Sequence, residues 1–278
     1  MHFFGSHFFD SHCHFDFAEF NADRAALWQA CNQQGVSRLL IPGVAPEQWP
    51  AAAQLCVEYS GLFYAAGIHP YWIEQQQWLQ KTADGLPTQK TRAKMIALIN
   101  DEIVRAGNSS ACVAVGECGL DGMIATPLAL QQQVLIAHIE VANQLCKPLI
   151  VHCVRAHNEL IALLKQHKVN YGGVIHAFTG SYEIARTYID MGFYLGVGGA
   201  ITYARANKTR AAIKKIPLDF LLLETDAPDM PLQGKQGQRN SPENIPQIAQ
   251  VLAELREEHL AEIASATWNN TLRLFHAG

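Results

Sequence analysis

The chain has 278 residues, of which 49% are hydrophobic and 17% are charged, and its formal net charge is −4. This composition is typical of a globular protein with a sizeable core, and the acidic balance excludes a broad basic nucleic-acid-binding face while leaving room for a local basic cleft. Its seven cysteines form no C-x-x-C pair, which indicates reduced thiols and a cytoplasmic location. No run of about 18 apolar residues occurs, so we expect no membrane-spanning helix.

Short apolar runs of the kind that form buried strands recur along the chain, and longer amphipathic stretches separate them. We expect eight strands, at residues 8–11, 38–43, 62–67, 112–116, 148–151, 172–175, 193–196 and 220–223. Helical spacing predicts helices at residues 21–34, 46–59, 92–106, 127–146, 156–167, 181–191, 207–215, 241–255 and 260–275.

Eight strands that each precede a helix are the pattern of an α/β protein of the (β/α)8 TIM barrel type, whose strands are buried on both faces and read as continuous apolar runs. A doubly wound open sheet is the competing architecture, since the number of strands separates the two poorly. No internal repeat or Pro/Ser-rich linker divides the sequence, so we expect one barrel domain over residues 1–278.

The Gln-rich segment at residues 72–91 is the longest connection without clear periodicity, and it is either a lid or a solvated loop. It contains Trp72 and Trp78. Both side chains have two interpretations: they stack on unpaired bases, or they anchor the connection to the barrel.

Side chains that can bind metal stand where several expected strands end. In DSHCHFD (10–16), His12 and His14 share one face of an extended chain while Cys13 points away. Four further ligand-capable residues follow later strands: Glu117, His152, His176 and Asp226. The carboxyl ends of all barrel strands meet at one face, where the active site of this fold is built, so we expect these six residues to form one cluster.

Four imidazoles and two carboxylates exceed what one tetrahedral ion needs, and they suit two divalent ions of uncertain identity, Zn, Mn, Mg, Ni or Fe. Two such ions lower the pKa of a shared water and produce a hydroxide nucleophile near neutral pH. We expect Glu117 to bridge them, because a carboxylate has one oxygen for each ion. Strand alternation directs Cys13, Cys118 and Cys153 towards the helices, as packing residues.

The motifs together resemble the TatD family of metal-dependent deoxyribonucleases, within the amidohydrolase-like metal-dependent hydrolase barrels. The matching segments, in family order over nearly the whole chain, are DSHCHFD (10–16), GIHP (67–70), VGECGLD (115–121), PLIVHC (148–153), HAFTG (176–180), GVGG (196–199) and ETDAPDMP (224–231). The stretches GGAITYARANKTR and ETDAPDMPLQGKQGQRNSPENI are most similar to the YjjV-type branch of that family.

The resemblance also implies roles for individual residues. It implies two metal sites that share Glu117, one with His12, His14 and Asp226 and the other with His152 and His176. Asp226 would also orient or deprotonate the attacking water. His69 of GIHP would face the substrate phosphate, and the alternative is that it caps its own turn.

Basic residues follow the last two expected strands: Arg205, Lys208, Arg210, Lys214, Lys215, Lys235 and Arg239. Loops after strands seven and eight often bind phosphate in this fold, and arginine binds phosphate oxygens in a bidentate manner. We expect Arg205 and Arg239 to contact substrate. The lysines between residues 208 and 215 fit the solvated face of a helix equally well.

The sequence leaves three functions open. The first is a phosphodiesterase or exonuclease-like deoxyribonuclease acting on single-stranded DNA, DNA ends or short oligonucleotides, with no obligate protein partner evident. The alternative is a hydrolase of a carbonyl-centred bond, such as an amide, a lactone or an aminoacyl-tRNA ester, on the same two-metal site. A metal-binding scaffold with little turnover is the third, and the retention of Asp226 beside a complete ligand set argues against it.

Overall fold

Eight parallel strands in sequence order line the centre of the computed structural model, which describes residues 7–106 and 111–277. They are β1 (Phe8–Asp10), β2 (Val36–Ile41), β3 (Leu62–Ala66), β4 (Cys112–Asp121), β5 (Leu149–Val154), β6 (Gly173–Ile175), β7 (Phe193–Val197) and β8 (Leu221–Leu223). The Ser11 amide donates to the Leu223 carbonyl over 2.9 Å, which brings the end of β1 beside β8. Sequential order with this closure confirms the TIM barrel and excludes the doubly wound sheet.

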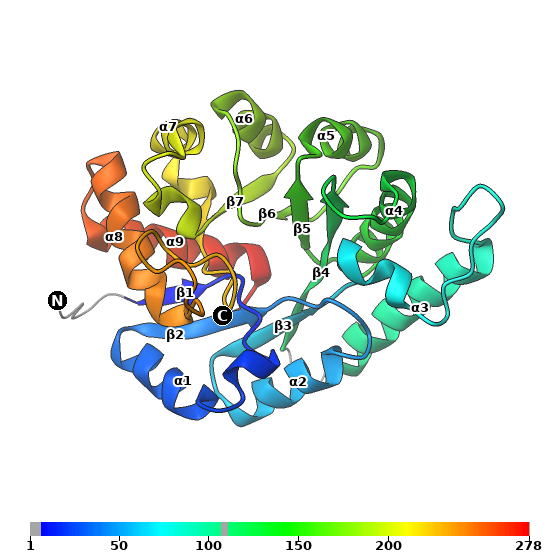
Figure 1. The fold of residues 1–278 in the computed structure, drawn as a ribbon, viewed down its shortest axis with the longest axis horizontal. Helices are drawn as coiled ribbons and strands as arrows, with labels where there is room; N and C mark the ends of the chain where they lie inside the picture. Colours follow the sequence, from blue (N-terminus) through cyan, green and yellow to red (C-terminus); the bar gives the residue numbers. More distant parts are fainter. Residues whose placement is uncertain (1–6, 107–110, 278) are drawn as a thin grey trace.

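Helices surround the barrel on its outside (Figure 1). They are α1 (Arg24–Gln33), α2 (Trp49–Glu58), α3 (Gln89–Ala106), α4 (Leu128–Gln144), α5 (His157–Gln166), α6 (Tyr182–Asp190), α7 (Asn207–Lys215), α8 (Ile245–Arg256) and α9 (Leu260–Phe275). Short 3-10 turns occur at η1 (Ala18–Phe20), η2 (Pro70–Gln75), η3 (Gly199–Thr202), η4 (Leu218–Phe220) and η5 (Pro242–Asn244). None of the helices in the described part of the chain is long and apolar enough to cross a membrane.

The strands bury both of their faces, as expected for a parallel barrel. Residues such as Leu39 and Leu149 face a large cluster shared with the helices. Their neighbours Leu40 and Ile150 belong to a smaller cluster that also contains Phe275 of α9. Because the end of α9 packs on this smaller cluster, it closes one end of the barrel interior, and a site can open only at the other end.

Strand β4 is longer than its apolar run. The sequence predicted a strand at 112–116, but β4 continues to Asp121 because Cys118 to Asp121 pair with Val151 to Val154 of β5. The pairing resumes there after an irregularity between Val115 and Cys118. Hydrophobicity does not mark this second half, because its inward positions carry acidic side chains and glycine.

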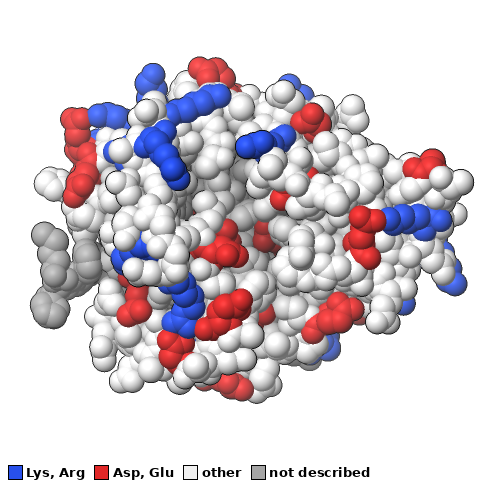
Figure 2. Space-filling view, viewed as in Figure 1, with Lys and Arg blue, Asp and Glu red and all other residues white. Residues whose placement is uncertain are grey.

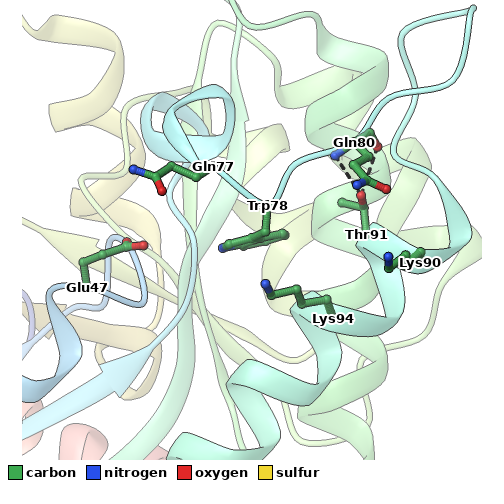
Figure 3. Close-up of a pocket in the computed structure, with 7 residues that line it drawn as sticks. All are labelled: Glu47, Gln77, Trp78, Gln80, Lys90, Thr91 and Lys94. Atoms are coloured by element: carbon green, nitrogen blue, oxygen red, sulfur yellow. Dashed lines mark hydrogen bonds between the residues drawn. The ribbon is translucent and has the colours of Figure 1, made fainter.

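The connection between β3 and α3 is partly structured, with η2 at its start and an isolated bridge between Lys81 and Pro87. The Thr91 hydroxyl contacts the backbone amide and carbonyl of Gln80 and fastens the connection to the first turn of α3. Trp78 is half-buried against the main core, so its ring anchors the connection to the barrel. The exposed part of the Trp78 side chain lines a surface cavity (Figure 3).

Candidate metal centre

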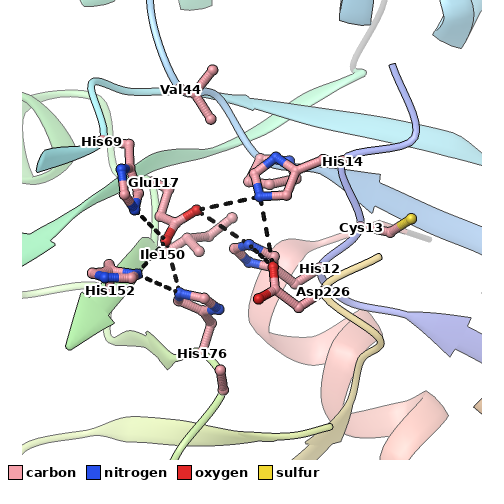
Figure 4. A network of polar contacts seen from close by, with 12 residues as sticks. His12, Cys13, His14, Val44, His69, Glu117, Ile150, His152, His176 and Asp226 are labelled. Carbon is pink, nitrogen blue, oxygen red and sulfur yellow. Dashed lines mark hydrogen bonds and ion pairs between the residues drawn. The ribbon is translucent and has the colours of Figure 1, made fainter. Parts of the chain in front are cut away.

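All six predicted metal-binding residues meet at one end of the barrel, and His69 joins them (Figure 4). Glu117 lies within β4, and His152 lies within β5. His12 and His14 follow β1 and are not part of it, because β1 ends at Asp10. In the view of Figure 2, acidic side chains lie in the hollow at the centre of this face while lysines and arginines stand around its rim.

Glu117 stands at the centre of the cluster and presents its two oxygens to different histidines. Oε2 lies 3.2 Å from Nε2 of His12. Oε1 lies 2.7 Å from Nε2 of His176 and 3.0 Å from Nδ1 of His152. The carboxylate is 1% exposed, so both oxygens depend on these imidazoles or on bound cations for compensation.

Asp226 completes the side of the cluster that Oε2 faces. Its Oδ1 lies 3.5 Å from Nε2 of His12 and 3.6 Å from Nε2 of His14. The Asp226 amide donates to the His12 carbonyl over 2.9 Å, which locks the segment after β8 to the segment after β1. This backbone contact holds Asp226 beside His12 and His14, although more than two hundred residues separate Asp226 from the two histidines in sequence.

The site fits divalent cations, since several of its buried polar atoms make no hydrogen bond of regular geometry although they lie close to other ligand-capable atoms. Both ring nitrogens of His12, Nδ1 of His14 and Oε2 of Glu117 are buried and accept or donate no hydrogen bond within the described residues. An unpaired buried polar atom is unfavourable, and structures contain few of them. Of these atoms, Nε2 of His12 and Oε2 of Glu117 face the cluster, and they are the kinds of nitrogen and oxygen donor that transition-metal ions bind.

Burial and the central carboxylate set the protonation of the imidazoles. Burial lowers the pKa of His12 to about 4 and that of His14 to about 3, so both rings stay neutral and keep a lone pair for a metal. Burial would also lower the pKa of His176, but the adjacent Glu117 carboxylate outweighs it and raises this pKa to about 10. Burial alone would raise the pKa of Glu117, yet His176 and His69 hold it well below its usual range.

One ring nitrogen of His69 caps its own turn and the other lies near the cluster, while the interpretation that His69 faces the substrate phosphate stays a prediction. Its Nδ1 accepts a hydrogen bond from the Tyr71 amide over 3.1 Å and caps η2. Its Nε2 lies 3.5 Å from Oε1 of Glu117, within the metal-capable group that also contains His152. The capping bond fixes the tautomer and aims the second nitrogen at the cluster, so the two interpretations do not compete.

Three buried acids that sequence reasoning did not select support the ligands. Asp121 Oδ2 lies 3.2 Å from Nε2 of His152, and Glu224 Oε1 lies 3.9 Å from Nδ1 of His176. Asp10 accepts hydrogen bonds from the His12 amide and from Thr225. Asp121 could have been found, because residues 117, 119 and 121 share one face of an extended strand if that strand continues beyond 116.

The cysteines beside the ligands point away from the cluster, as predicted. Cys13, Cys118 and Cys153 all belong to the core between strands and helices. No metal-capable group within the described residues contains a thiol.

The basic residues after β7 and β8 lie in different environments. Arg239 is held by a bidentate ion pair with Asp23, at 2.8 and 2.6 Å, and also donates to the Glu19 carbonyl. Arg205 is exposed, stands 5.1 Å from the Tyr203 ring centroid and lines a cavity of about 390 Å³ with Met230. Several of the others contact the protein itself: Arg210 bonds the Ile201 carbonyl, Lys214 pairs with Glu257, and Lys235 donates to Asn244.

Residues 9–276 match the sequence profile of the family described as TatD related DNase. The chain belongs to this family. It is 40% identical to the uncharacterized metal-dependent hydrolase YjjV of Escherichia coli K12, over 97% of this chain and 98% of that protein. The crystal structure of YjjV, described as a TatD homologue, superposes with a TM-score of 0.87 over 97% of this chain and 98% of that one, at 39% identity.

A relative within the TatD related DNase family carries a more specific name. The chain is 33% identical to the 3′-5′ ssDNA/RNA exonuclease TatD of Cronobacter sakazakii, over 93% of this chain and 94% of that protein. The resemblance that the sequence motifs indicated, including the YjjV-type branch, is confirmed by these matches.

Proposed function

We propose that this TatD-family protein is a metal-dependent phosphodiesterase that removes nucleotides from the ends of single-stranded DNA. The observation that carries this proposal is the position of Glu117, whose two oxygens face separate groups of histidines in one buried cluster. The name of the Cronobacter relative supports a nucleic-acid substrate. All seven cysteines are free thiols, which supports the cytoplasmic location that the sequence indicates.

Two divalent cations fit the donor set, and Glu117 would bridge them. One would be held by His12, His14, Asp226 and Oε2 of Glu117, and the other by His152, His176 and Oε1. Such ions, when bound, polarise a phosphoryl group and lower the pKa of a bound water. The mixed nitrogen and oxygen ligands accept Zn, Mn, Ni or Fe, and Mg is the least suited of the five candidates because it prefers oxygen.

Asp226 and His69 would bind the attacking water and the substrate phosphate. The Asp226 side chain is 15% exposed whereas that of Glu117 is 1% exposed, so Asp226 is the carboxylate that an attacking water can reach. Asp226 would orient this water and accept its proton. His69, whose Nε2 faces the cluster and whose other nitrogen is fixed by the Tyr71 amide, would hold a phosphate oxygen.

The two arginines would bind the substrate backbone under different conditions. Arg205 is exposed beside its cavity and is free to meet a phosphate. Arg239 would bind a phosphate only by exchanging its Asp23 carboxylate for it. Arg205 is therefore the stronger candidate for a substrate contact.

The test is turnover of metal-reconstituted protein on 3′- and 5′-labelled single-stranded DNA and on a chromogenic phosphodiester, with Asp226→Asn as control. We expect loss of the labelled terminal nucleotide that requires both added metal and Asp226. Intact DNA after incubation with protein shown to hold two ions would contradict the proposal. Screening esters, lactones and amides would then separate a carbonyl-centred hydrolase from a metal-binding scaffold, which hydrolyses none of them.

A further inference from the structure

A second polar cavity lies outside the metal centre, at the start of α3. It has a volume of about 550 Å³ and is lined by Trp78, Glu47, two glutamines and two lysines, Lys90 and Lys94 (Figure 3). Cavities of roughly 300 to 1,000 Å³ are the usual size for small-molecule sites. The cavity is therefore large enough for a nucleotide-sized group.

The cavity lies on the same end of the barrel as the metal centre. Helices in this fold run antiparallel to the strands, so the first turns of α3, which carry Lys90 and Lys94, are on the end where the strands terminate. The cavity shares Glu47 and Gln77 with a neighbouring cavity of about 440 Å³ that reaches Val44 and Trp72.

That neighbouring cavity leads to the cluster. The Trp72 ring lies edge-on to the His69 ring with centroids 5.5 Å apart, and the His69 amide donates to the Val44 carbonyl over 3.0 Å. Figure 4 shows His69 beside Glu117. The two cavities thus form one track that runs from Trp72, whose ring contacts His69 of the cluster, to Trp78.

The charges along the track match a nucleic-acid strand. Lys90 and Lys94 are one helical turn apart and project from one side of α3. Neither forms an ion pair with a residue that the structure describes, whereas Arg92 between them pairs with Glu140 of α4. Lys94 Nζ lies over the Trp78 ring, 5.9 Å from its centroid, so a cation stands at the ring on which a base would stack.

Gln76 forms part of the wall of the neighbouring cavity. Gln76 is 6% exposed and lines that cavity, and its Oε1 has no hydrogen-bond partner in the described part of the chain. Its Nε2 donates to the Trp72 carbonyl over 3.2 Å, which fixes the amide orientation. The Gln76 side chain is therefore a fixed part of the cavity wall, and its buried Oε1 is not a contact for a ligand.

We infer that the track is an accessory subsite for single-stranded nucleic acid, in which Trp78 stacks on a base several nucleotides from the reacting bond. Lys90 and Lys94 bind the phosphates beside that base. The exposed Glu47 carboxylate repels phosphate and accepts from a base amino group, so it orients the strand with its backbone towards the lysines. This inference rests on the proposed function only for the identity of the substrate class.

Equilibrium binding tests the subsite without requiring catalysis. Fluorescence anisotropy of a labelled eight-nucleotide single strand is measured with Asp226→Asn protein in EDTA, and Trp78→Ala and Lys94→Gln are introduced separately into this background. Each change is expected to weaken binding about tenfold, because stacking and phosphate contacts of this kind are of that size. Replacing both lysines should lower the slope of log K against log salt by about 1.4, at about 0.7 per phosphate contact.

Matched controls on the opposite end of the barrel are Tyr171→Ala, an exposed aromatic residue before β6, and Lys165→Gln, in the last turn of α5. Both should leave binding unchanged. Lys94→Gln keeps the fold because Lys94 is exposed, so it decides the matter if Trp78→Ala is unstable.

A second experiment compares substrates of different length. In catalytically intact protein, the Trp78 and Lys94 changes should raise KM for the eight-nucleotide strand and leave KM for a dinucleotide and for a chromogenic phosphodiester unchanged. Equal losses on short and long substrates, or unchanged binding of the long strand, would overturn the subsite. If the wild-type protein cleaves no DNA, the proposed function fails, and the binding arm still decides the subsite by itself.

Discussion

At the scale of single residues, the site depends on one buried carboxylate surrounded by imidazoles. Glu117 contacts His12 through one oxygen and His176 through the other, and it is almost completely buried. Burial of that carboxylate without cations or protonated imidazoles would be strongly unfavourable. Replacing Glu117 should therefore affect both metal positions, whereas replacing one histidine should affect one.

We predict that His14→Ala lowers the bound metal by about one equivalent and that Glu117→Ala lowers it by about two. Elemental analysis of purified, metal-reconstituted protein measures this difference. Cys13→Ala is the matched control for His14→Ala, because Cys13 is its neighbour but belongs to the core between strands and helices. Full metal content in His14→Ala protein would show that His14 is not a ligand.

Asp121 is predicted to act through His152. Its Oδ2 lies 3.2 Å from Nε2 of His152, while the Nδ1 atom of the same ring faces Glu117. A carboxylate in this position orients the ring, and its loss lowers metal affinity about 10- to 100-fold in comparable sites. Metal titration of Asp121→Asn should show that decrease for one equivalent only. A lower affinity for both metal equivalents would show that Asp121 does not act through His152 alone.

At the scale of elements, the end of β4 and its pairing with β5 place the central ligands. Gly119 pairs with His152 across these strands, and a methyl group at Gly119 would lie 2.0 Å from the His152 carbonyl oxygen. Gly119 also has a positive φ of 150°, which other residues rarely adopt. Only glycine allows the two strands to approach this closely while Glu117 and His152 both point inward.

Gly119→Ala should lower the free energy of unfolding by about 3 kcal/mol or more, from overpacking together with backbone strain. Gly192→Ala is the control, because φ is 88° there but no atom lies within 4 Å of the added methyl group. It should cost about 1 kcal/mol from strain alone. Denaturant unfolding followed by circular dichroism measures both values, and equal losses would show that the clash with β5 is relieved.

Arg239 joins the loop after β8 to the start of α1, and this contact competes with a role in phosphate binding. Its pair with Asp23 is partly exposed, so Asp23→Ala should lower stability by no more than about 1 kcal/mol. If Arg239 binds substrate phosphate, Asp23→Ala frees the guanidinium and lowers KM, while Arg239→Ala raises it. Steady-state kinetics on a labelled oligonucleotide would show unchanged KM in both variants if the arginine only joins the two segments.

At the scale of the whole molecule, the hydrophobic core and the metal centre occupy different parts of the barrel. The core lies between strands and helices and in the closed end of the barrel interior, where Phe275, Leu40 and Ile150 belong to one cluster. The metal centre occupies the opposite end. The barrel should therefore stay folded when the ions are removed.

We predict that chelation abolishes hydrolysis and leaves the far-ultraviolet circular dichroism spectrum unchanged, with activity restored by adding back divalent metal. The melting temperature should fall, because metal that binds only the folded state stabilises it by mass action. Loss of secondary structure on chelation would show that the ions are required for folding. Activity that survives exhaustive chelation, confirmed by elemental analysis, would contradict the metal-dependent mechanism.

The sequence by itself indicated the number of strands and the six metal-capable residues, and it favoured a barrel over a doubly wound sheet. It could do so because buried parallel strands read as apolar runs, and because polar residues directly after such runs are conspicuous. The sequence also separated Cys13 from His12 and His14 through the two-residue repeat of an extended chain.

Only the tertiary structure decided what lies around those residues. The second half of β4 has no apolar run, since its inward side chains serve the site, so the sequence ended that strand early and missed Asp121. The pairing of Arg239 with Asp23 joins positions more than two hundred residues apart, and the track to Trp78 arises where two separate loops meet. Contacts of this kind follow from the closure of the barrel, which brings distant segments together without leaving a local pattern in the sequence.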